Sequence, residues 1–583
     1  MMHPRFQLSV LALSLWMTCG DGRAEPADQD HAWRHAWLPK RVASFDKAQF
    51  AAMLKADPFG AQVLALAGAP ACGVDYHQFT YATTGARSEA TDASGVIMTP
   101  TGGRGCAGPR PVLLYTHGTA VNKAYNLAKV TDPTNEAWQE AAMVAAFYAA
   151  QGYIVVAPNY AGYDTSSLGY HPYLNARQQS KDVMDALGTA RAALRFGMRT
   201  QARDNGKLFI TGYSQGGHVA MATHRAMEAR GMHVTASAPM SGPYAMLAFG
   251  DATAIYSPGL GGTIYYPMII NSYQRAYGDI YQSLGDIYTP TYAPGIDTLI
   301  PGNYTFETLI TSGKLPQLAL YDSTTPGQGG EPSSGSAALD ALLAVPDAAS
   351  RPIAALAFGR PSLFTNAFRI RFALDSLATP DGAVPQPTNL LPPVQDPAMP
   401  LRRALKQNDL RGWTPKAPLM LCGGMNDPEV FYSVNTLTMK QLWSDKLASG
   451  RVQVVDADPS THGDESLAGQ IVSLVGGIAA QVAATEPGVS ASQLGEDVRR
   501  AVTAAPAFAA YFTAQGKPNA PQGVMALAIA GAAGKAATEA ASQGVSSPAL
   551  IASAVGSAVI ASYHYPNTQL ACETAATAYF ARF

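Results

Sequence analysis

The sequence predicts an α/β protein built on a mainly parallel sheet with helices on both faces. Short apolar runs, typical of buried strands, alternate with segments of helical periodicity from about residue 72 to 244. The same alternation returns between 417 and 480. Within the first stretch, one apolar run ends in a Gly-x-Ser-x-Gly turn that opens into a helical segment. These three observations together favour the α/β class.

The individual elements follow from composition and spacing. Two strand-like segments flank a polar Thr-Gly-Ala-Arg turn and predict a hairpin. The continuous apolar runs that follow fit strands buried on both faces, as in a parallel sheet. In chain order, we expect strands at 76–82, 94–99, 111–116, 153–157, 208–211, 234–238, 417–422 and 452–455, and helices at 135–151, 175–194, 218–227 and 465–480.

The alternation stops at residues 245–410, which are rich in Gly, Pro, Tyr and Ser. This segment is interpreted as an inserted cap or lid. The other boundaries are set by where the alternation of strands and helices begins and ends. The last hundred residues contain no recognisable catalytic or binding motif. The predicted organisation is a signal peptide at 1–24, an N-terminal helical segment at 25–70, the first part of the core at 71–244, the cap at 245–410, the second part of the core at 411–485 and an Ala-rich, mostly helical extension at 486–583.

The N-terminus has the features of an export signal. Arg5 precedes an apolar stretch at 8–17 that is too short to span a bilayer. Small residues around Ala24 predict cleavage before Glu25, so the protein is expected to be secreted or periplasmic. A lipoprotein signal at Cys19 is the less favoured alternative. No later run reaches about 18 apolar residues, so we expect no stable membrane insertion.

Cysteine count and charge limit the function further. Without Cys19, four cysteines remain, and an even number in an exported chain indicates two disulfides. Three pairings are possible; Cys72–Cys106 is favoured because these residues bracket the hairpin, which leaves Cys422 with Cys572. Alternatively, Cys422 is simply a small buried hydrophobe. A formal net charge of −2 gives no electrostatic reason to expect a nucleic-acid partner.

Ser214 is the predicted nucleophile. It lies at the centre of the Gly-x-Ser-x-Gly turn, which is followed by a helical segment. A strained strand-to-helix turn presents a serine hydroxyl to a base, and glycines leave room around it. A chance match is the alternative in a chain with 54 glycines, so the flanking strand and helix carry the prediction.

A serine near neutral pH needs a base, and the base needs an orienting acid. Asp427 follows the first strand after the predicted cap, in a Gly-rich turn where Asn426 and Glu429 are its local competitors. His462 follows the last predicted strand and is the expected base. His564 is the other histidine after Asp427, and it is interpreted as a packed or surface residue of the tail.

The oxyanion hole requires two backbone N–H donors. We expect them from Gln215, which follows the nucleophile, and from Thr119, in the loop after the strand at 111–116. His117 is expected to orient that loop, although it could instead be read as a base. A Gly-x-Gly-x-x-Gly match at 103–108 leads into a strand, which argues against nucleotide binding. No metal-binding motif occurs, and we expect neither a metal nor a cofactor.

Together these motifs resemble the α/β-hydrolase superfamily and most closely the secretory lipase family, the group similar to yeast lipase A. The resemblance rests on Tyr115-Thr-His-Gly-Thr119, Ala157-Pro-Asn-Tyr-Ala-Gly162, Gly212-Tyr-Ser-Gln-Gly-Gly217, Gly423-Gly-Met-Asn-Asp427 and His462. It covers roughly residues 70–485. It implies an α/β-hydrolase fold and hydrolysis of carboxylic esters through an acyl-serine, without a cofactor.

The function expected from the sequence is that of a secreted serine esterase or lipase acting on a small-molecule or lipid ester. A serine peptidase or an acyltransferase on the same scaffold is the first alternative, because the same triad serves these reactions. The second is an inactive exported binding protein. Substrate-binding residues, acyl chain length and oligomeric state stay open at this level.

Overall fold

The computed structural model describes residues 38–348, 351–458, 521–543, 558 and 561–583. The described residues form one nine-stranded sheet in the order β1-β2-β3-β5-β4-β6-β7-β8-β9. The predicted signal peptide and the predicted helix at 465–480 lie outside the described residues. The strands are β1 (Lys40–Phe45), β2 (Gly73–Thr84), β3 (Ala90–Thr101), β4 (Gly108–Thr116), β5 (Ile154–Pro158), β6 (Ala202–Tyr213), β7 (Ala236–Met240), β8 (Leu419–Gly423) and β9 (Val452–Asp456).

The sheet is antiparallel at one edge and parallel through its centre. β1, β2 and β3 form an antiparallel ribbon, and β3 pairs antiparallel with β5. From β5 through β4, β6, β7 and β8 to β9, all pairings are parallel. The central strands β5, β7 and β8 are buried at every residue, as their continuous apolar runs predict. The predicted fold class is confirmed; the edge strand β1 was not anticipated.

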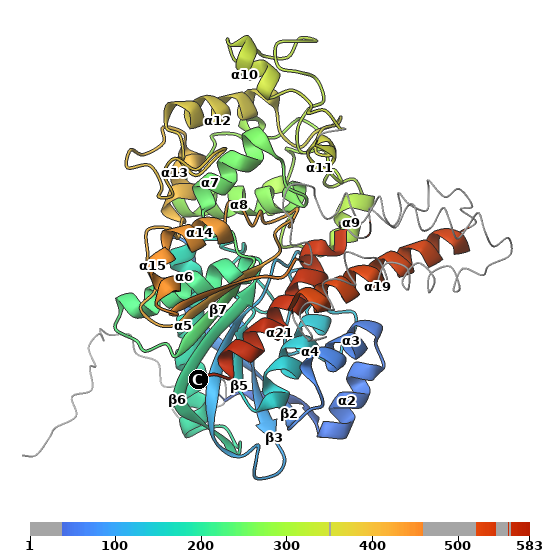
Figure 1. Ribbon diagram of the computed structural model, residues 1–583, viewed down its shortest axis with the longest axis vertical. Helices are drawn as coiled ribbons and strands as arrows, with labels where there is room; N and C mark the ends of the chain where they lie inside the picture. The colour runs from blue at the N-terminus through green and yellow to red at the C-terminus, as the bar shows by residue number, and fades with distance from the viewer. Residues whose placement is uncertain (1–37, 349–350, 459–520, 544–557, 559–560) are drawn as a thin grey trace, which may run out of the picture.

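Helices cover both faces of this sheet (Figure 1). α5 (Ala176–Phe196) packs beside α6 (Gln215–Ala229) on one face. α3 (Pro58–Ala67), α4 (Trp138–Phe147) and the C-terminal α21 (Gln569–Phe580) pack together on the other face. The remaining helices of the core are α2 (Lys47–Lys55), α14 (Thr436–Leu442), α15 (Ser444–Ala448) and α19 (Pro521–Ser542).

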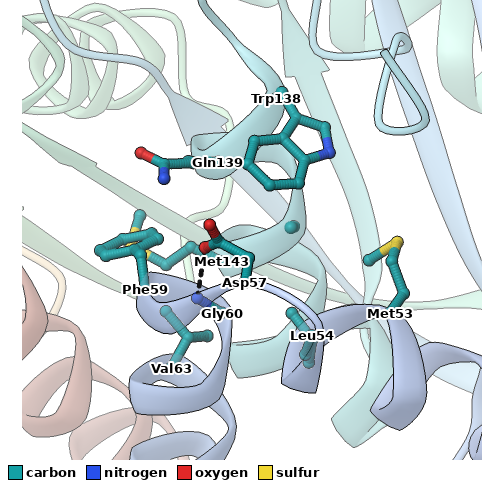
Figure 2. A pocket seen from close by; sticks show the side chains of 10 residues that line it. Met53, Leu54, Asp57, Phe59, Gly60, Val63, Trp138, Gln139 and Met143 are labelled. Carbon is teal, nitrogen blue, oxygen red and sulfur yellow. Dashed lines mark hydrogen bonds between the residues drawn. The ribbon is translucent and has the colours of Figure 1, made fainter. Parts of the chain in front are cut away.

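The start of α3 shows how local sequence sets these helix ends. Pro58 occupies the first turn, and the Asp57 carboxylate accepts the Gly60 backbone N–H at 2.8 Å. Figure 2 shows this cap beside a small apolar space where α2 and α3 meet the beginning of α4, lined by residues that include Leu54 and Trp138. The N-terminal helices are thus packed onto the core that carries α4.

Residues 241–418, between β7 and β8, form what we call the insertion. Within the described residues the insertion adds no strand to the sheet, and its apolar side chains form a cluster that also includes Val121, Tyr173 and Leu174 of the core. Its helices lie together beyond one end of the sheet (Figure 1). They are α7 (Met246–Asp251), α8 (Gly262–Tyr277), α9 (Phe306–Thr311), α10 (Ala337–Leu342), α11 (Pro352–Ala355), α12 (Asn366–Ala378) and α13 (Pro400–Gln407).

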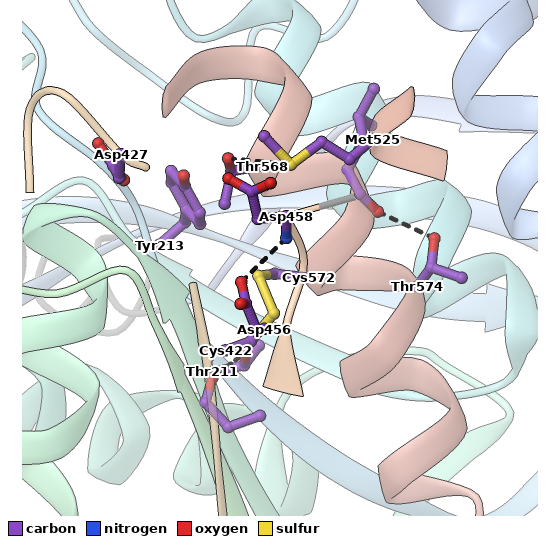
Figure 3. Close-up of a disulfide and its surroundings, with 12 residues drawn as sticks. Thr211, Tyr213, Cys422, Asp427, Asp456, Asp458, Met525, Thr568, Cys572 and Thr574 are labelled. Atoms are coloured by element: carbon purple, nitrogen blue, oxygen red, sulfur yellow. Dashed lines mark hydrogen bonds between the residues drawn. A yellow bond between two sulfur atoms is a disulfide. The ribbon is translucent and has the colours of Figure 1, made fainter. Parts of the chain in front are cut away.

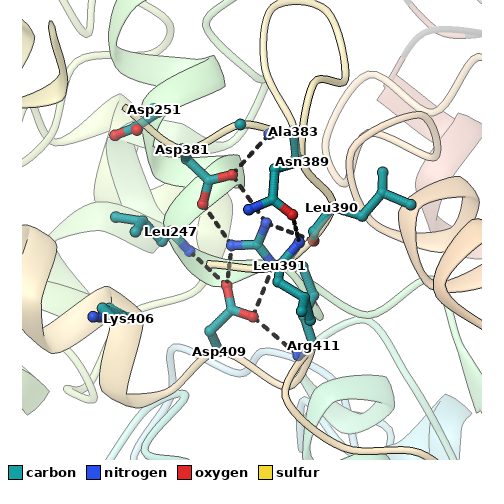
Figure 4. A network of polar contacts seen from close by, with 12 residues as sticks. Leu247, Asp251, Asp381, Ala383, Asn389, Leu390, Leu391, Lys406, Asp409 and Arg411 are labelled. Atoms are coloured by element: carbon teal, nitrogen blue, oxygen red, sulfur yellow. Dashed lines mark hydrogen bonds and ion pairs between the residues drawn. The ribbon is translucent and has the colours of Figure 1, made fainter. Parts of the chain in front are cut away.

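A buried ionic network holds the insertion together near its return to the core (Figure 4). The Arg411 guanidinium lies between the carboxylates of Asp381, at 2.5 Å, and Asp409, at 2.8 Å. Asp409 also accepts the Leu247 backbone N–H at the start of α7. All three charged side chains are buried, so removing one would leave an uncompensated charge in the interior.

Both favoured disulfides are present. Cys72 and Cys106 bridge the two ends of the β2–β3 hairpin, with Cα atoms 5.7 Å apart. Cys422 in β8 is joined to Cys572 in α21, with Cα atoms 5.6 Å apart. Figure 3 shows this second bridge between the strand and the C-terminal helix, in the same view as Asp427. It fastens the end of the chain to the strand that precedes Asp427.

Candidate active site

Ser214 lies on the sharp turn between β6 and α6. β6 ends at Tyr213 and α6 begins at Gln215, so Ser214 alone makes the turn. Its backbone has φ 59° and ψ −121°, a conformation that non-glycine residues rarely adopt. Backbone strain of this kind is concentrated at functional sites, where surrounding packing holds it in place.

The glycines around Ser214 are required by close packing against β4 and β7. A Cβ on Gly212 would lie 2.1 Å from Thr116 Oγ1, and one on Gly216 would lie 1.9 Å from the Thr116 carbonyl oxygen. A Cβ on Gly217 would lie 2.3 Å from the Met240 carbonyl oxygen. These contacts are with backbone or with a hydroxyl held by hydrogen bonds, so they cannot relax cheaply. The Gly-x-Ser-x-Gly motif therefore forms a turn that close packing requires, and it is not a chance match.

Asp427 lies in the turn that follows β8. Its Oδ1 accepts the backbone N–H groups of Glu429 at 2.9 Å and Val430 at 3.0 Å. Its Oδ2 lies 2.6 Å from Nδ1 of His564. Of its two competitors, Asn426 bonds to Asp458 and Glu429 bonds to Tyr265. Asp427 is thus fixed by backbone donors on one oxygen and presents the other to a histidine.

That histidine is His564, from the short irregular helix η5 (Tyr563–Thr568) just before α21. Tyr213, the residue before Ser214, donates its hydroxyl to the His564 carbonyl at 2.6 Å, and the two rings lie 4.9 Å apart. Nε2 of His564 is buried and has no hydrogen-bond partner among the described residues. His564 therefore has one ring nitrogen on a carboxylate and the other available for a further partner.

His462, the base predicted from the sequence, lies outside the described residues, so that prediction stays untested. His564, expected to be a packed or surface residue of the tail, instead lies against Asp427. A signal for His564 was present in the chain: Cys572 closely follows His564, and its favoured partner Cys422 closely precedes Asp427. The predicted disulfide brings the two segments near each other, but it does not by itself fix a contact between His564 and Asp427.

The electrostatic surroundings favour a protonated His564. Burial acts to lower the pKa of its imidazole, but the charges of the nearby Asp427 and Glu429 carboxylates, with the hydrogen bond that Nδ1–H donates to Asp427, outweigh it. The net effect raises the pKa of His564 above its ordinary value. An imidazolium at this position is stabilised, as a base that takes up a proton during a reaction requires.

The loop after β4 lies beside Ser214 and is held from several sides. The Gly118 backbone N–H points to Glu140 Oε1 at 3.3 Å, and the Thr119 hydroxyl bonds to the Tyr173 hydroxyl at 2.7 Å. His117 is stacked between Tyr125 and Tyr160. Its two ring nitrogens lie against backbone carbonyl oxygens, so His117 supports the loop and offers no free base.

Gln215 begins α6, so its backbone N–H has no acceptor within the helix. Its side-chain amide lies 2.7 Å from Nε2 of His171, where the amide N–H donates to the ring. Burial lowers the pKa of His171 to about 3, so the ring is neutral and able to accept. The positions of Thr119 and Gln215, the two predicted oxyanion donors, are therefore both fixed by side-chain hydrogen bonds.

A cavity of about 390 Å³ opens over Ser214. It contains Gly118, Thr119 and His564 together with two residues of the insertion, Tyr265 and Phe306. The full lining is Gly118, Thr119, Tyr125, Glu136, Gln139, Glu140, Tyr213, Ser214, Tyr265, Phe306, Glu429, Ala561, His564, Tyr565 and Gln569. Across the described part of the chain, no cluster of His, Cys, Asp or Glu is arranged to hold a metal ion. Within the same residues, no helix is both long and apolar enough to cross a bilayer.

Comparison with solved structures identifies proteins that share this arrangement of strands and helices. The rice cell wall degrading esterase LipA from Xanthomonas oryzae has a similar crystal structure, with 27% identity and a TM-score of 0.54 over 74% of this chain and 92% of that one. The chain has the α/β-hydrolase fold. A putative hydrolase from Legionella pneumophila shares the α/β-hydrolase fold at 20% identity, with a TM-score of 0.50 over 71% of this chain and 90% of that one.

The family model of the secretory lipases matches residues 131–256 of this α/β-hydrolase, a segment that includes Ser214. No curated protein sequence is significantly similar to the chain. The secretory lipase match and the likeness to an esterase support a carboxylic ester hydrolase. The resemblance stated from the sequence is confirmed at the level of the superfamily fold and of this family segment.

The Cys422–Cys572 bridge provides a test of how His564 is positioned. Replacing both cysteines with serine should lower stability by about 5 kcal/mol in the chain-entropy picture, for a separation of 150 residues. It should also lower kcat by about tenfold or more, because small displacements of a reacting group are costly. The matched control replaces Cys72 and Cys106, separated by 34 residues, and should cost about 4 kcal/mol without changing kcat of the folded enzyme.

Chemical denaturation and initial ester hydrolysis rates, measured at a temperature where both variants are folded, check this prediction. Equal kcat values for the two double variants would show that the Cys422–Cys572 bridge does not position His564.

Proposed function

We propose that this protein is an exported serine esterase that cleaves carboxylic esters through Ser214, His564 and Asp427. One observation carries the assignment of the base: Nδ1 of His564 lies 2.6 Å from Asp427, its buried Nε2 has no partner among the described residues, and His564 lines the cavity that contains Ser214. Ser214 does not yet bond to His564, and such bonds often form only in the substrate complex.

In the proposed mechanism, Ser214 Oγ attacks the ester carbonyl and its proton passes to His564 Nε2. Asp427 keeps the Nδ1 proton in place and stabilises the imidazolium. The backbone N–H groups of Gln215 and Thr119 donate to the oxyanion of the tetrahedral intermediate. His564 then returns the proton to the leaving alcohol, and the acyl-serine remains. Water, deprotonated by His564, releases the carboxylic acid and restores Ser214.

We propose that the insertion, which includes residues 245–410, acts as the cap expected from the sequence. Tyr265 from α8 and Phe306 from α9 line the cavity over Ser214, which supports a role for the insertion in substrate selection. The two disulfides support export, because such bridges persist in oxidising compartments. Transfer of the acyl group to an alcohol or amine instead of water is the alternative that this geometry also allows.

Covalent labelling tests the proposed function directly. A fluorophosphonate should modify the protein once, on the tryptic or chymotryptic peptide that contains Ser214, because only an activated serine attacks phosphorus readily. Peptide mass spectrometry identifies the site, and hydrolysis of p-nitrophenyl esters of increasing chain length measures the activity that labelling removes. Labelling without loss of hydrolysis, or no labelling at all, would contradict a serine esterase.

The pH profile should report the raised pKa of His564. Only neutral imidazole can accept the Ser214 proton, so kcat/KM should rise with pH, with a midpoint above the ordinary histidine value of 6.5. Glu429→Gln should move the midpoint down, because it removes one of the charges that raise the pKa. Glu539→Gln, an exposed change on α19, is the matched control and should leave the midpoint unchanged. A wild-type midpoint below 6.5 would contradict the prediction.

A further inference from the structure

The cavity over Ser214 is acidic. Three of its lining residues are glutamates, Glu136, Glu140 and Glu429, whereas no lysine or arginine belongs to its lining among the described residues. Glu136 and Glu140 come from the segment that opens α4, and Glu429 comes from the turn after β8. Carboxylates from two separate parts of the fold therefore border one cavity.

The two glutamates near α4 are held by neutral donors. Glu136 accepts the backbone N–H groups of Val121 at 3.2 Å and Asn122 at 2.8 Å. Glu140 accepts the hydroxyls of Tyr115 at 2.7 Å and Tyr125 at 2.5 Å, together with the Gly118 N–H. These bonds fix the carboxyl groups in place but bring no positive charge to them. Burial, aided by the charge of Glu140, raises the pKa of Glu136 to about 7 against the pull of its backbone donors.

Glu429, which borders the cavity from the turn after β8, is also held by a neutral donor. Its Oε2 accepts the Tyr265 hydroxyl at 2.5 Å, and within the described residues its carboxylate has no lysine or arginine partner. Burial raises the pKa of Glu429, and the neighbouring Asp427 adds to the effect. The His564 imidazolium acts to lower the pKa of Glu429, but only while His564 carries the proton. Among the described residues no lysine or arginine compensates these carboxyl groups, so a cation bound in the cavity would stabilise the ionised forms that burial disfavours.

Aromatic side chains line the same cavity. Tyr125, Tyr265, Phe306 and Tyr565 all contribute to its wall. Aromatic faces attract cations, and quaternary ammonium groups are commonly bound by such rings. The glutamates do not converge as a metal site in the described residues. His564, whose buried Nε2 has no partner among the described residues, lines the same cavity, as expected of the place where an ester is bound.

We propose that this cavity selects esters whose alcohol portion carries a positive charge, with quaternary ammonium (choline-type) esters as the substrate class. This inference rests on the proposed esterase function. The cation is held by the aromatic wall and by the fields of Glu136 and Glu429, while Ser214 attacks the ester carbonyl. The released alcohol is the cation, and the acyl-serine is hydrolysed as above.

A matched pair of esters tests the proposal. Butyrylcholine and 3,3-dimethylbutyl butyrate have the same shape, but only the first is charged. We expect wild-type kcat/KM to favour butyrylcholine by about tenfold at low ionic strength, the discrimination that one moderate cation contact supplies. Glu136→Gln and Glu429→Gln should each lower this ratio about threefold, and added salt should lower it further. Glu539→Gln should leave the ratio as in the wild type.

Inhibition gives a second readout that does not depend on how the ester lies. Choline should inhibit hydrolysis of p-nitrophenyl butyrate at lower concentration than its uncharged analogue 3,3-dimethylbutan-1-ol. If kcat/KM is equal for the two esters, and choline and its uncharged analogue inhibit at equal concentrations, the cation selectivity is overturned while the esterase function stays intact. Failure to hydrolyse any of the three esters would instead overturn the esterase function itself, so the two failures are distinguishable.

Discussion

Replacing Ser214 with alanine is expected to lower kcat by at least ~10³-fold, with little change in KM. The nucleophilic oxygen is lost, and only binding and the oxyanion donors remain to accelerate the reaction. Alanine keeps the backbone turn, including its positive φ of 59°, so the folded structure should be preserved. Initial rates on a short-chain p-nitrophenyl ester measure the effect.

Thermal unfolding supplies the control for the Ser214 variant. Its midpoint should lie close to that of the wild type, because the Ser214 side chain makes no hydrogen bond that caps α6. A folded Ser214→Ala protein that still hydrolyses esters at near wild-type rates would remove Ser214 from the mechanism and with it the acyl-serine.

Replacing His564 with alanine should be about as damaging as replacing Ser214. Without the imidazole, Ser214 loses the proposed acceptor of its proton, and Asp427 loses the partner that it orients at 2.6 Å. Residues that act as one catalytic unit are strongly non-additive, so the Ser214→Ala/His564→Ala double variant should be little worse than either single variant. The same hydrolysis assay, run with all three variants, measures this.

His462→Ala is the matched comparison for the base. Since the proposal assigns proton transfer to His564, the His462 variant should retain most of its activity when folded. Activity that survives His564→Ala but disappears with His462→Ala would reverse the assignment and restore the histidine that the sequence analysis preferred. Asp427→Asn tests how Asp427 acts on His564. The amide keeps the shape of the carboxylate, but it disfavours the His564 tautomer with the proton on Nδ1.

The sequence predicted those features that depend on local chemistry. Ser214 was recognisable because its turn is continuous in the chain: strand, glycines, serine and helix follow one another, and each glycine reports a close backbone contact. The parallel strands were recognisable because their burial on both faces requires unbroken apolar runs. Asp427 was found because an acid at the end of a strand is also a local pattern, and its contact with His564 supports that choice.

The base could not be chosen in the same way. Two histidines follow Asp427, and their order in the chain satisfies the same rule, so nothing local separates His462 from His564. The distinction depends on which part of the C-terminal segment packs near Asp427. The bridge between α21 and β8 holds the segment that contains His564 in that position. The edge strand β1 was missed for a related reason, since an exposed six-residue strand owes its pairing to β2 and has little periodicity of its own.

By itself, the sequence determined that this protein has a strained serine turn on a mainly parallel α/β sheet, two pairs of cysteines and an acid after the strand at 417–422. These are properties of contiguous residues, because burial and backbone conformation restrict which residue types a short segment can contain. Only the tertiary structure decided which histidine meets Asp427, and that three glutamates from separate segments border one cavity. Those arrangements arise from packing between parts of the chain far apart in sequence, which no local pattern encodes.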